Sequence, residues 1–570
     1  MKSGKKTKRS KRLFLLLMAA LLSGALTARS RSAAAETDMP YNTPRNGGYN
    51  IIFIVADQER YFETPPAGTN WRARELLQST GATFEKHYIC SNVSTPSRSV
   101  MYTGRHITET KMTDNVDFPW QSALREDIAT IGHLMREAGY YTAYKGKFHM
   151  LNEGAGVIPD SNSGGFDRAG KDSLEVYGFS DWNFEGDVAG SMLQGYHADE
   201  YIKGASVRWL RDTGASLNKS GVPFFLAVNF VNPHDIMFYN PAGQQTAMET
   251  NAAPPRNTVY APGYNYLPPA WEHAAHEEGG IPAHREYHYG WIAMAGALPR
   301  DRETVKKFND YYLNCIQDQD NSLMGLLSEL ERLGMMDNTI IILTSDHGEM
   351  GGSHGLTGKG PFMYESNIRV PFIIVHPAYK GDARRIKSVT SHLDIAPTVL
   401  DMTSLPAERK ERLALSKGLA GHSLLPLLDG RAADGKVRDS ALYAFGMISM
   451  IDASYSLLSG AAAAPDLTKR GLLRGIVTER YKFARYFSPL DFNTPTTLDD
   501  LYNRNDIELY DLETDPHERR NLAADPARRK TNAELIAEMN RRLNELIERE
   551  IGVDNGDEMA EALKFFGVER

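Results

Sequence analysis

The sequence is poor in cysteine and in long apolar runs, and it has no excess of positive charge. Its two cysteines, Cys90 and Cys315, are too few for a disulfide framework; one bridge between them is compatible with the sequence but is not implied by it. The net charge of −8 gives no general attraction to nucleic acid or to anionic membranes. Any anion-binding site must therefore be a local cluster of cationic side chains.

The one long apolar run lies near the N-terminus. A basic segment, residues 1–12, is followed by apolar residues from Leu13 to about Leu26 and then by small residues near Ala28 and at 33–35. This pattern predicts a signal peptide over residues 1–35, and hence export to the periplasm or the medium, although it does not fix the cleavage site. A retained membrane anchor is the alternative, but the run is short for a spanning helix. No cysteine follows it, so the sequence gives no lipoprotein signal.

Several apolar runs rich in β-branched residues lead to polar side chains. Residues 50–55 lead to Asp57 and Gln58, 224–230 lead to His234, and 339–344 lead to Asp346 and His347, while 370–375 form a further run. Such runs are typical of strands buried in a parallel sheet. The clearest helical pattern between them extends from Val305 to Leu333, and Gly334 follows it.

This alternation predicts an α/β fold with a large, mostly parallel central sheet flanked by helices on both faces. Polar residues at the carboxyl ends of such strands gather at one edge of the sheet, where ligands bind. From about residue 440 the segments become shorter, and a polar helix follows from about Lys530 to Glu550. We therefore expect a catalytic domain over residues 45–435 and, over 436–570, a smaller α+β subdomain with an antiparallel sheet and a terminal helix.

The most informative segment runs from Ser94 to Arg105 and reads Ser-Thr-Pro-Ser-Arg-Ser-Val-Met-Tyr-Thr-Gly-Arg. Pro96 suits the first turn of a helix, and the amides there, with Arg98 one turn further on, favour an anion beside residue 94. Ser and Thr before Pro can also do no more than cap a helix. The segment resembles the signature of the type I sulfatases of the alkaline phosphatase superfamily, Cys/Ser-x-Pro-x-Arg followed five residues later by Thr-Gly.

Resemblance to the serine-type branch of that family implies that Ser94 is oxidised after translation to formylglycine, the catalytic nucleophile. The oxidation is done by a radical-SAM maturating enzyme of anaerobic bacteria, unless serine was engineered in place of cysteine. Cys90 does not fit the motif, because Asn92 stands where proline is required. The segment from Glu508 to Leu512, followed by 515–516 and 521–522, also resembles the C-terminal subdomain of sulfatases, and the central sheet is expected to be alkaline-phosphatase-like.

Two of the strand ends resemble the metal-ligand positions of the family. Asp57, Gln58, Asp346 and His347, with residue 94, are therefore the predicted metal ligands. A mainly oxygen set suits a hard divalent cation, calcium first and magnesium or manganese next. Taken alone, an Asp at a strand end can be a helix cap, and a His can fill a turn. Many sulfatases have Asp-Asp at the first position, so Gln58 is the weaker candidate; Asp-Gln and Asp-His are closer to choline sulfatases and phosphonate monoester hydrolases.

Three further segments resemble family positions around the ester: Gly146-Lys147-Phe148-His149, Asn232-Pro233-His234 and Gly358-Lys359-Gly360. The resemblance implies that Arg98, Lys147 and Lys359 hold the sulfate oxygens. His234, with or without Lys359, would protonate the leaving oxygen, and His149 would take a proton from the hydrated formylglycine so that sulfate is released. An isolated Lys or His in a loop is otherwise usually solvated. His354 could contact the ester or have a structural role.

The resemblance implies an exported sulfatase that hydrolyses a sulfate monoester to an alcohol and inorganic sulfate. The stretch from Met237 to Pro299 is rich in aromatic residues and could wall a cleft for a sulfated saccharide, or it could be a packed loop. Aryl sulfate and choline sulfate remain open as substrates. The alternatives are a phosphonate monoester hydrolase or phosphodiesterase of the same superfamily, and an unmodified, inactive binding protein with this fold.

Overall fold

The computed structural model describes residues 48–151, 173–182, 193–244, 260, 263–275, 280–379, 381, 383–432, 435–455 and 464–569. The predicted signal peptide, residues 1–35, lies outside these ranges. Within them, no helix combines the length and the apolar character that a membrane span needs.

A seven-stranded sheet forms the centre of the fold, in the order β3-β4-β1-β5-β6-β2-β7. Its strands are β1 (Asn50–Asp57), β2 (Ala82–Tyr88), β3 (Tyr141–Gly146), β4 (Phe224–Pro233), β5 (Thr339–Ser345), β6 (Phe372–Val375) and β7 (Arg384–Ser391). The described neighbours pair in parallel, except that β6 runs antiparallel to both β5 and β2. The predicted, mostly parallel α/β sheet is therefore confirmed.

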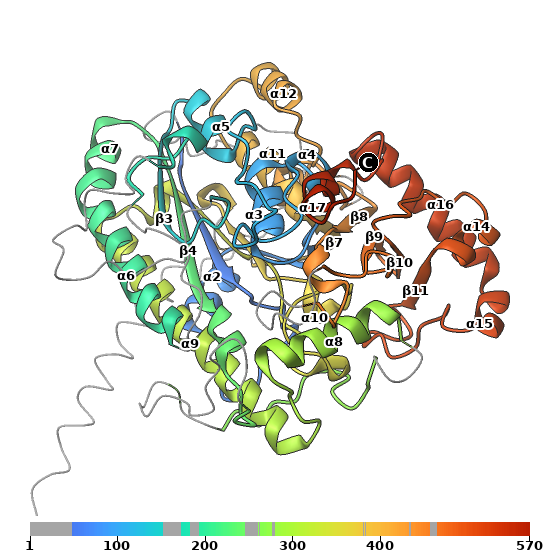
Figure 1. The fold of residues 1–570 in the computed structure, drawn as a ribbon. Helices are drawn as coiled ribbons and strands as arrows, with labels where there is room; N and C mark the ends of the chain where they lie inside the picture. The colour runs from blue at the N-terminus through green and yellow to red at the C-terminus, as the bar shows by residue number, and fades with distance from the viewer. Residues whose placement is uncertain are drawn as a thin grey trace, which may run out of the picture. The chain divides into compact units, whose positions relative to one another are not determined.

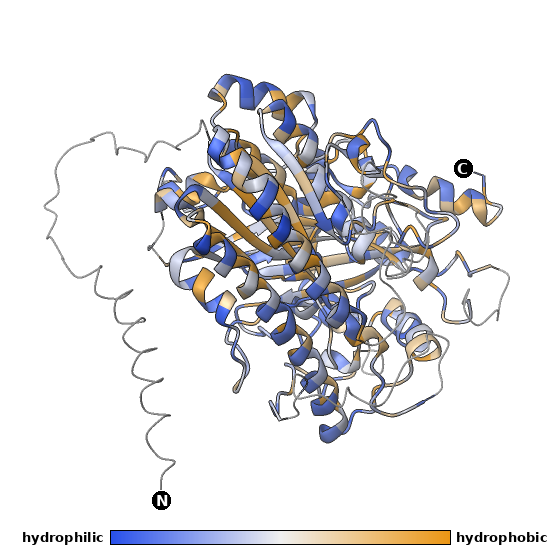
Figure 2. Cartoon of the chain, turned by 90° about the vertical axis from the view of Figure 1, so that its left-hand side faces the viewer, coloured by the Kyte–Doolittle hydropathy of each residue, from blue (hydrophilic) through white to orange (hydrophobic). Residues whose placement is uncertain are grey.

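The central strands are apolar because helices cover both of their faces. Every residue of β1, β4 and β5 is buried, which explains their continuous apolar sequences. Figure 2 shows these hydrophobic strands behind helices whose outer surfaces are largely hydrophilic. In Figure 1, α6 (Gln194–Trp209), α7 (Ala215–Ser220) and α9 (Arg302–Arg332) lie on one side of the sheet. On the other side lie α3 (Ser94–Thr103) and α11 (Ile395–Asp401).

The helix predicted from Val305 to Leu333 is α9, and it begins three residues earlier, at Arg302. Asp301 accepts a hydrogen bond from the Thr304 amide (2.9 Å) and so caps the helix. The remaining α-helices of the described chain are α2 (Arg72–Thr80), α4 (Ile107–Thr110), α5 (Ile131–Glu137), α8 (Pro282–Ala295), α10 (Glu365–Ile368), α12 (Ala407–Ser416), α13 (Leu425–Asp429), α14 (Leu498–Arg504), α15 (Pro526–Thr531), α16 (Ala533–Glu550) and α17 (Ala560–Phe565).

A second, antiparallel sheet is built from the C-terminal part of the chain. Its order is β11-β10-β9-β8, with β8 (Ser440–Phe445), β9 (Leu472–Thr478), β10 (Tyr481–Phe487) and β11 (Asp506–Asp511). Helix α16 packs against this sheet. The antiparallel sheet and terminal helix agree with the sequence, although Pro526 begins a separate short helix, α15, before α16. The boundary between residues 435 and 436 stays a prediction.

Both cysteines are buried free thiols, so no bridge joins Cys90 to Cys315.

Candidate active site

Adjacent parallel strands deliver the predicted polar residues to one edge of the central sheet. Strands β3, β4, β1 and β5 are consecutive in the sheet and parallel, so their carboxyl ends lie together. The residues at and after these ends are Lys147 and His149 (β3), His234 (β4), Asp57 and Gln58 (β1), and Asp346 and His347 (β5). Residues far apart in the sequence therefore meet because of the strand order.

Asp57, Asp346 and His347 lie close enough together to bind one metal ion. All three are buried, and one potential ligand atom of each lies within 4.8 Å of the others. Nε2 of His347 lies 3.6 Å from an oxygen of each carboxylate. Nδ1 of His347 lies 3.1 Å from the Gly348 carbonyl oxygen, which can only accept, so Nδ1 carries the proton and Nε2 presents its lone pair. Burial lowers the pKa of His347 to about 4, so the ring is neutral at neutral pH, as a metal ligand must be.

Two orphaned oxygen atoms support the fit of this site to a hard cation. Oδ1 of Asp57 and Oε1 of Gln58 are buried and have no hydrogen-bond partner. The backbone N–H of Gln58 donates to Oδ1 of Asp346 (3.0 Å), which places Gln58 beside the same cluster. A buried oxygen left without a donor costs about 1–3 kcal/mol, and a divalent cation would satisfy both atoms. Oxygen donors with one imidazole nitrogen are a set that calcium, magnesium or manganese accepts.

Ser94 is the first residue of α3 and lies at this cluster. Its Oγ is 3.3 Å from Nε2 of His347 and 3.5 Å from Nζ of Lys359. The preceding residue, Val93, has φ 61° and ψ 161°, so the chain turns sharply before entering the helix. No side chain of this segment caps α3, so the segment is not serving as an ordinary helix cap.

Arg98 lies one turn along α3 and reaches the carboxylates of the cluster. Its Nε donates to Asp346 (3.0 Å), and its Nη2 donates to Asp57 (3.2 Å). Its Nη1 donates to the Lys147 carbonyl (2.9 Å) and to Oδ1 of Asn229 (3.0 Å). The guanidinium is fully buried and donates to groups of the protein itself, and its predicted contact with sulfate stays a prediction.

Two buried lysines and a buried histidine complete the electrostatics. Nζ of Lys147 lies 2.8 Å from Asp57, and Nζ of Lys359 lies 2.9 Å from Nε2 of His347. Burial alone would raise the pKa of Asp57, but Lys147, His234, Lys359 and Arg98 hold it well below its usual range. Burial lowers the pKa of Lys359 to about 8, and burial followed by the two lysines lowers the pKa of His234 well below its usual value. The guanidinium and the two ammonium groups bring three positive charges to the cluster.

His149 is held by a carboxylate that the sequence did not reveal. Its Nε2 lies 2.9 Å from Oδ2 of Asp117. Burial raises the pKa of Asp117, but the charge of His149 and its hydrogen bond outweigh burial and lower the pKa to about 2. The carbonyl of His149 accepts from Oγ1 of Thr95, so His149 and α3 are tied together. Asp117 has no neighbouring motif that could have identified it.

Two more residues of the site were missed by sequence reasoning. Glu349 accepts from Nε2 of Gln58 (2.6 Å), and Asn229 accepts from Arg98 and from the Tyr102 hydroxyl (both 3.0 Å). Asn229 did give a signal, because it is a polar residue inside the otherwise apolar run of β4. Glu349 follows His347 by two residues, but spacing alone does not show what it contacts.

His354 and the aromatic stretch pack mainly against the protein. The ring of His354 stacks on Tyr364 with 3.8 Å between ring centroids, and its Nδ1 lies 3.0 Å from Nδ1 of His273. The buried aromatic and histidine side chains in the described part of the stretch are Phe238, Tyr239, Tyr260, His284, Tyr287 and Trp291. Tyr289, by contrast, is 54% exposed. In the described part of the stretch, most aromatic side chains therefore pack against the protein and do not form an exposed wall of a cleft.

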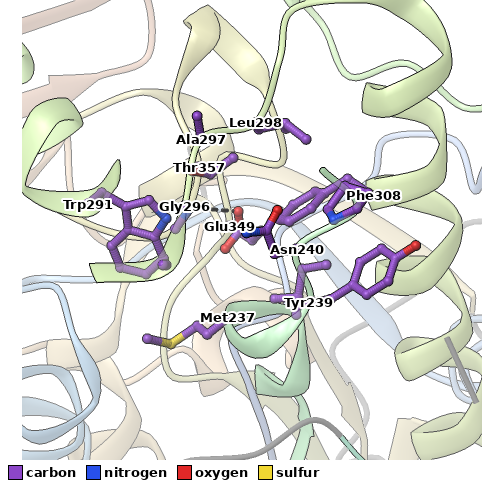
Figure 3. Close-up of a pocket in the computed structure, with 14 residues that line it drawn as sticks. Met237, Tyr239, Asn240, Trp291, Gly296, Ala297, Leu298, Phe308, Glu349 and Thr357 are labelled. Atoms are coloured by element: carbon purple, nitrogen blue, oxygen red, sulfur yellow. Dashed lines mark hydrogen bonds between the residues drawn. The ribbon is translucent and has the colours of Figure 1, made fainter. Parts of the chain in front are cut away.

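A small pocket lies beside the Glu349 carboxylate (Figure 3). Its lining includes Met237, Tyr239, Asn240, Trp291, Phe308 and Glu349. In Figure 3, Glu349 lies between Trp291 on one side and Tyr239 and Phe308 on the other. The carboxylate that holds Gln58 is therefore also part of a pocket wall.

The chain is similar in sequence to a known family and to several curated relatives. A protein-family model described as Sulfatase matches residues 49–405. The chain is 25% identical over 544 residues to an N-acetylglucosamine-6-O-sulfatase from Bacteroides thetaiotaomicron, a match that covers 85% of each protein. It is also 25% identical over 442 residues to an extracellular sulfatase SULF-1 homolog from Drosophila melanogaster, covering 75% of this chain but only 35% of that protein.

Solved structures share the fold. A 2-O GAG sulfatase superimposes with a TM-score of 0.62 at 21% identity, covering 88% of this chain and 92% of that one. A phosphonate monoester hydrolase from Silicibacter pomeroyi gives a TM-score of 0.60 at 19% identity, covering 89% and 96%. Because both identities are low, these two similarities concern the fold alone.

Proposed function

This chain belongs to the sulfatase family, whose members are sulfuric ester hydrolases, and on that basis we propose that it is an exported enzyme that removes sulfate from a saccharide. The products would be the free alcohol and inorganic sulfate. The observation that carries the proposal is the position of Ser94, whose Oγ lies 3.3 Å from Nε2 of His347 inside a cluster of buried metal-ligand atoms. The residue that the family oxidises is thus the residue that touches the cluster.

The metal ligands would be Asp57, Gln58, Asp346 and His347, together with the side chain of residue 94. Calcium is our first choice because oxygen donors predominate, with magnesium or manganese as the alternatives. When bound, the cation would polarise the oxygen of residue 94 and balance charge on the ester. Arg98 donates to both Asp57 and Asp346, so we assign it the role of holding these carboxylates in place rather than of gripping sulfate.

Formylglycine at position 94 would supply, once hydrated, one hydroxyl to attack sulfur and a second whose deprotonation releases sulfate. Lys147 and Lys359 would hold the sulfate oxygens, since both ammonium groups lie at the cluster. Lys359, with a pKa of about 8, is protonated at neutral pH and is one proton donor for the leaving oxygen. We assign His234 as the other: burial first, and then the charges of Lys147 and Lys359, lower its pKa, and a bound anion would offset the part that is due to the lysines.

His149 would accept the proton of the second hydroxyl. The Asp117 carboxylate accepts from Nε2 of His149, which leaves the lone pair on Nδ1. Removal of that proton forms the aldehyde carbonyl, breaks the carbon–oxygen bond to sulfate and releases inorganic sulfate. An unmodified serine has no second hydroxyl and would stall as its sulfate ester.

The substrate class and location are inferred from the relatives and from the N-terminus. A relative named N-acetylglucosamine-6-O-sulfatase, similar along 85% of this chain, favours a sulfated saccharide. Residues 1–35 favour export, and the serine motif implies a radical-SAM maturating enzyme as a partner in the bacterial host. These features together favour a periplasmic or secreted sulfatase.

A phosphonate monoester hydrolase is the second candidate, favoured by the Asp57-Gln58 pair and by the fold shared with such an enzyme. The two functions are separated by the ratio of kcat/KM for an aryl sulfate and for an aryl phosphonate monoester. A preference for the sulfate is expected, and a clear preference for phosphorus would favour the second candidate.

The modification itself is tested by mass spectrometry of the peptide that contains Ser94. We expect a loss of two hydrogens in protein from the native host, and no such change in protein made without a maturating enzyme. The Ser94→Ala variant is the matched control and should be inactive and unmodified. Active protein with intact serine would contradict the proposed mechanism, and inactive protein with intact serine would favour the binding-protein alternative.

A further inference from the structure

The side chain of Gln58 can serve a metal ion with only one of its two ends. Its carbonyl oxygen is an acceptor that can coordinate a cation, whereas its NH2 group is a donor that repels one. The two ends have nearly the same shape, so steric fit does not choose between them. The orientation of the side chain must therefore be set by a hydrogen-bond partner that can only accept or only donate.

In this structure Glu349 is such a partner, because its carboxylate oxygens act as hydrogen-bond acceptors. Its Oε2 accepts from Nε2 of Gln58 at 2.6 Å. Its Oε1 accepts from the backbone amides of Gly351 (2.8 Å) and Gly358 (2.7 Å). A carboxylate has no proton to donate, and this one already accepts from two backbone amides, so it binds the NH2 end of Gln58. The other end, Oε1 of Gln58, is buried without a hydrogen-bond partner.

The Gly358 contact extends this arrangement to the loop that carries Lys359. Gly358 has a positive φ of 73°, and a Cβ built there would lie 2.6 Å from the Tyr287 hydroxyl and 2.7 Å from the Trp291 ring. The glycine is therefore required both by its conformation and by the lack of space. The amide that donates to Glu349 consequently has little freedom to move, and Lys359 follows it directly.

We propose that Glu349 is a positioning residue, which holds the amide of Gln58 with its oxygen toward the metal site and joins this ligand to the Lys359 loop. The inference rests on the metal site of the proposed function. Glu349 is not itself a ligand, because both of its oxygens are engaged and because the described metal cluster consists of Asp57, Asp346 and His347. The proposed role of Glu349 is therefore to fix which end of the Gln58 side-chain amide faces the metal site.

The test is direct calorimetric titration of purified protein with calcium chloride, in Glu349→Gln and in a swapped double variant. The amide introduced at position 349 can donate to Oε1 of Gln58 and turn that side chain, so we expect calcium affinity to fall about tenfold or more. In the double variant Gln58→Glu with Glu349→Gln, the donor and acceptor are exchanged. One oxygen of the carboxylate introduced at position 58 then accepts from the amide at position 349 while the other remains for the metal, so affinity should return to within about threefold of the original protein.

Glu508→Gln is the matched control, because Glu508 is also a buried glutamate but lies on β11, away from the cluster. It should leave calcium affinity unchanged, and thermal unfolding should show that each variant is folded. If Glu349→Gln fails to fold, the double variant is the test of the positioning role. The inference requires the double variant to fold and to bind calcium, and it is wrong if the double variant does not.

The outcomes separate the inference from the proposed function. If the original protein binds neither calcium, magnesium nor manganese, the metal site of the proposed function is wrong. If it binds calcium and Glu349→Gln binds equally well, the positioning role is wrong while the metal site stands. If both variants bind weakly, the negative charge at position 349 matters rather than the orientation of the amide, and the inference is again overturned.

Discussion

Arg98 shows how a single side chain can hold two like charges together. Asp57 and Asp346 are both fully buried and both receive a hydrogen bond from its guanidinium. Two buried carboxylates repel each other strongly unless cations lie between or beside them. Removing one partner of a buried ion pair typically costs about 3–5 kcal/mol, because the remaining charge is left without compensation. Arg98 therefore places positive charge beside both of these carboxylates, the two proposed metal ligands, in an apolar interior.

The role of His149 leads to a prediction about which step fails in its absence. In His149→Ala the first chemical step should still occur, since the nucleophile and the lysines are unchanged. Release of sulfate should slow by about 100-fold or more, because general base catalysis contributes that much. Quenched samples should therefore contain a covalent sulfate ester on residue 94, detectable by the mass of the intact protein.

His273→Ala is the control for that experiment, because the contact described for His273 is with His354 and the proposed mechanism gives it no role. It should turn over substrate at close to the original rate and accumulate no ester. Unchanged steady-state turnover in His149→Ala would show that another group deprotonates the second hydroxyl.

The sequence identified the side chains that belong to contiguous motifs and missed those that act only through contacts in space. Ser94 and Arg98 are recognisable because they share one helix turn, and Asp346 because it directly follows an apolar strand. Asp117 and Glu349 are ordinary acidic residues in the sequence. Only the folded chain shows that one meets His149 and the other meets Gln58.

At the scale of secondary structure, the sequence did not predict the strands that lack both a continuous apolar run and an alternation of apolar and polar residues. β7, Arg384–Ser391, lies at the edge of the sheet, and its first five residues are only partly buried or exposed. β2 carries Glu85 and Lys86, which are also only partly buried. The antiparallel direction of β6 depends on its pairing with β5 and β2, which an apolar run of four residues does not specify.

Strand β11 contains a buried glutamate that should make stability depend on pH. Burial, followed by the charge of Glu518, raises the pKa of Glu508 to about 8. An unfolded glutamate has a pKa of about 4.3, so between these values the folded state holds a proton that the unfolded state has lost. The contribution of this group to stability therefore falls as the pH rises from about 4 to about 8.

Glu508→Gln removes this titration while keeping a side chain of the same shape. At about pH 9 we expect the variant to be more stable than the original protein by at least about 1 kcal/mol, and this gain should shrink toward pH 5. Thermal unfolding over that pH range measures the difference. Glu513→Gln, an exposed substitution just after β11, should show no such pH dependence. A gain that is constant across the range would mean that Glu508 is ionised in the folded protein.

At the scale of the whole molecule, residues Pro44–Arg570 form one compact unit, although they contain two sheets. One reason is a buried chain of polar and charged side chains that crosses the predicted boundary at residues 435 and 436. Arg438 donates to Asp394 at 2.6 Å and to Glu550 at 2.9 Å, and Glu550 lies 3.0 Å from Nε2 of His106. A shared apolar cluster also joins Tyr88, Val370 and Val389 of the central region to Ala441 and Tyr443 of β8.

Because ions and apolar side chains from both regions are buried together, neither region should be stable alone. Calorimetry of the intact chain should therefore show one cooperative unfolding transition, and a chain ending at residue 435 should be insoluble or unfolded. Such a truncation would take the Arg438 guanidinium from the buried Asp394 carboxylate, at a cost of a few kcal/mol, would remove Glu550 from His106, and would expose the apolar cluster to water. The opposite result, a soluble 44–435 fragment that unfolds cooperatively and binds calcium, would mean that the C-terminal sheet is an independent domain.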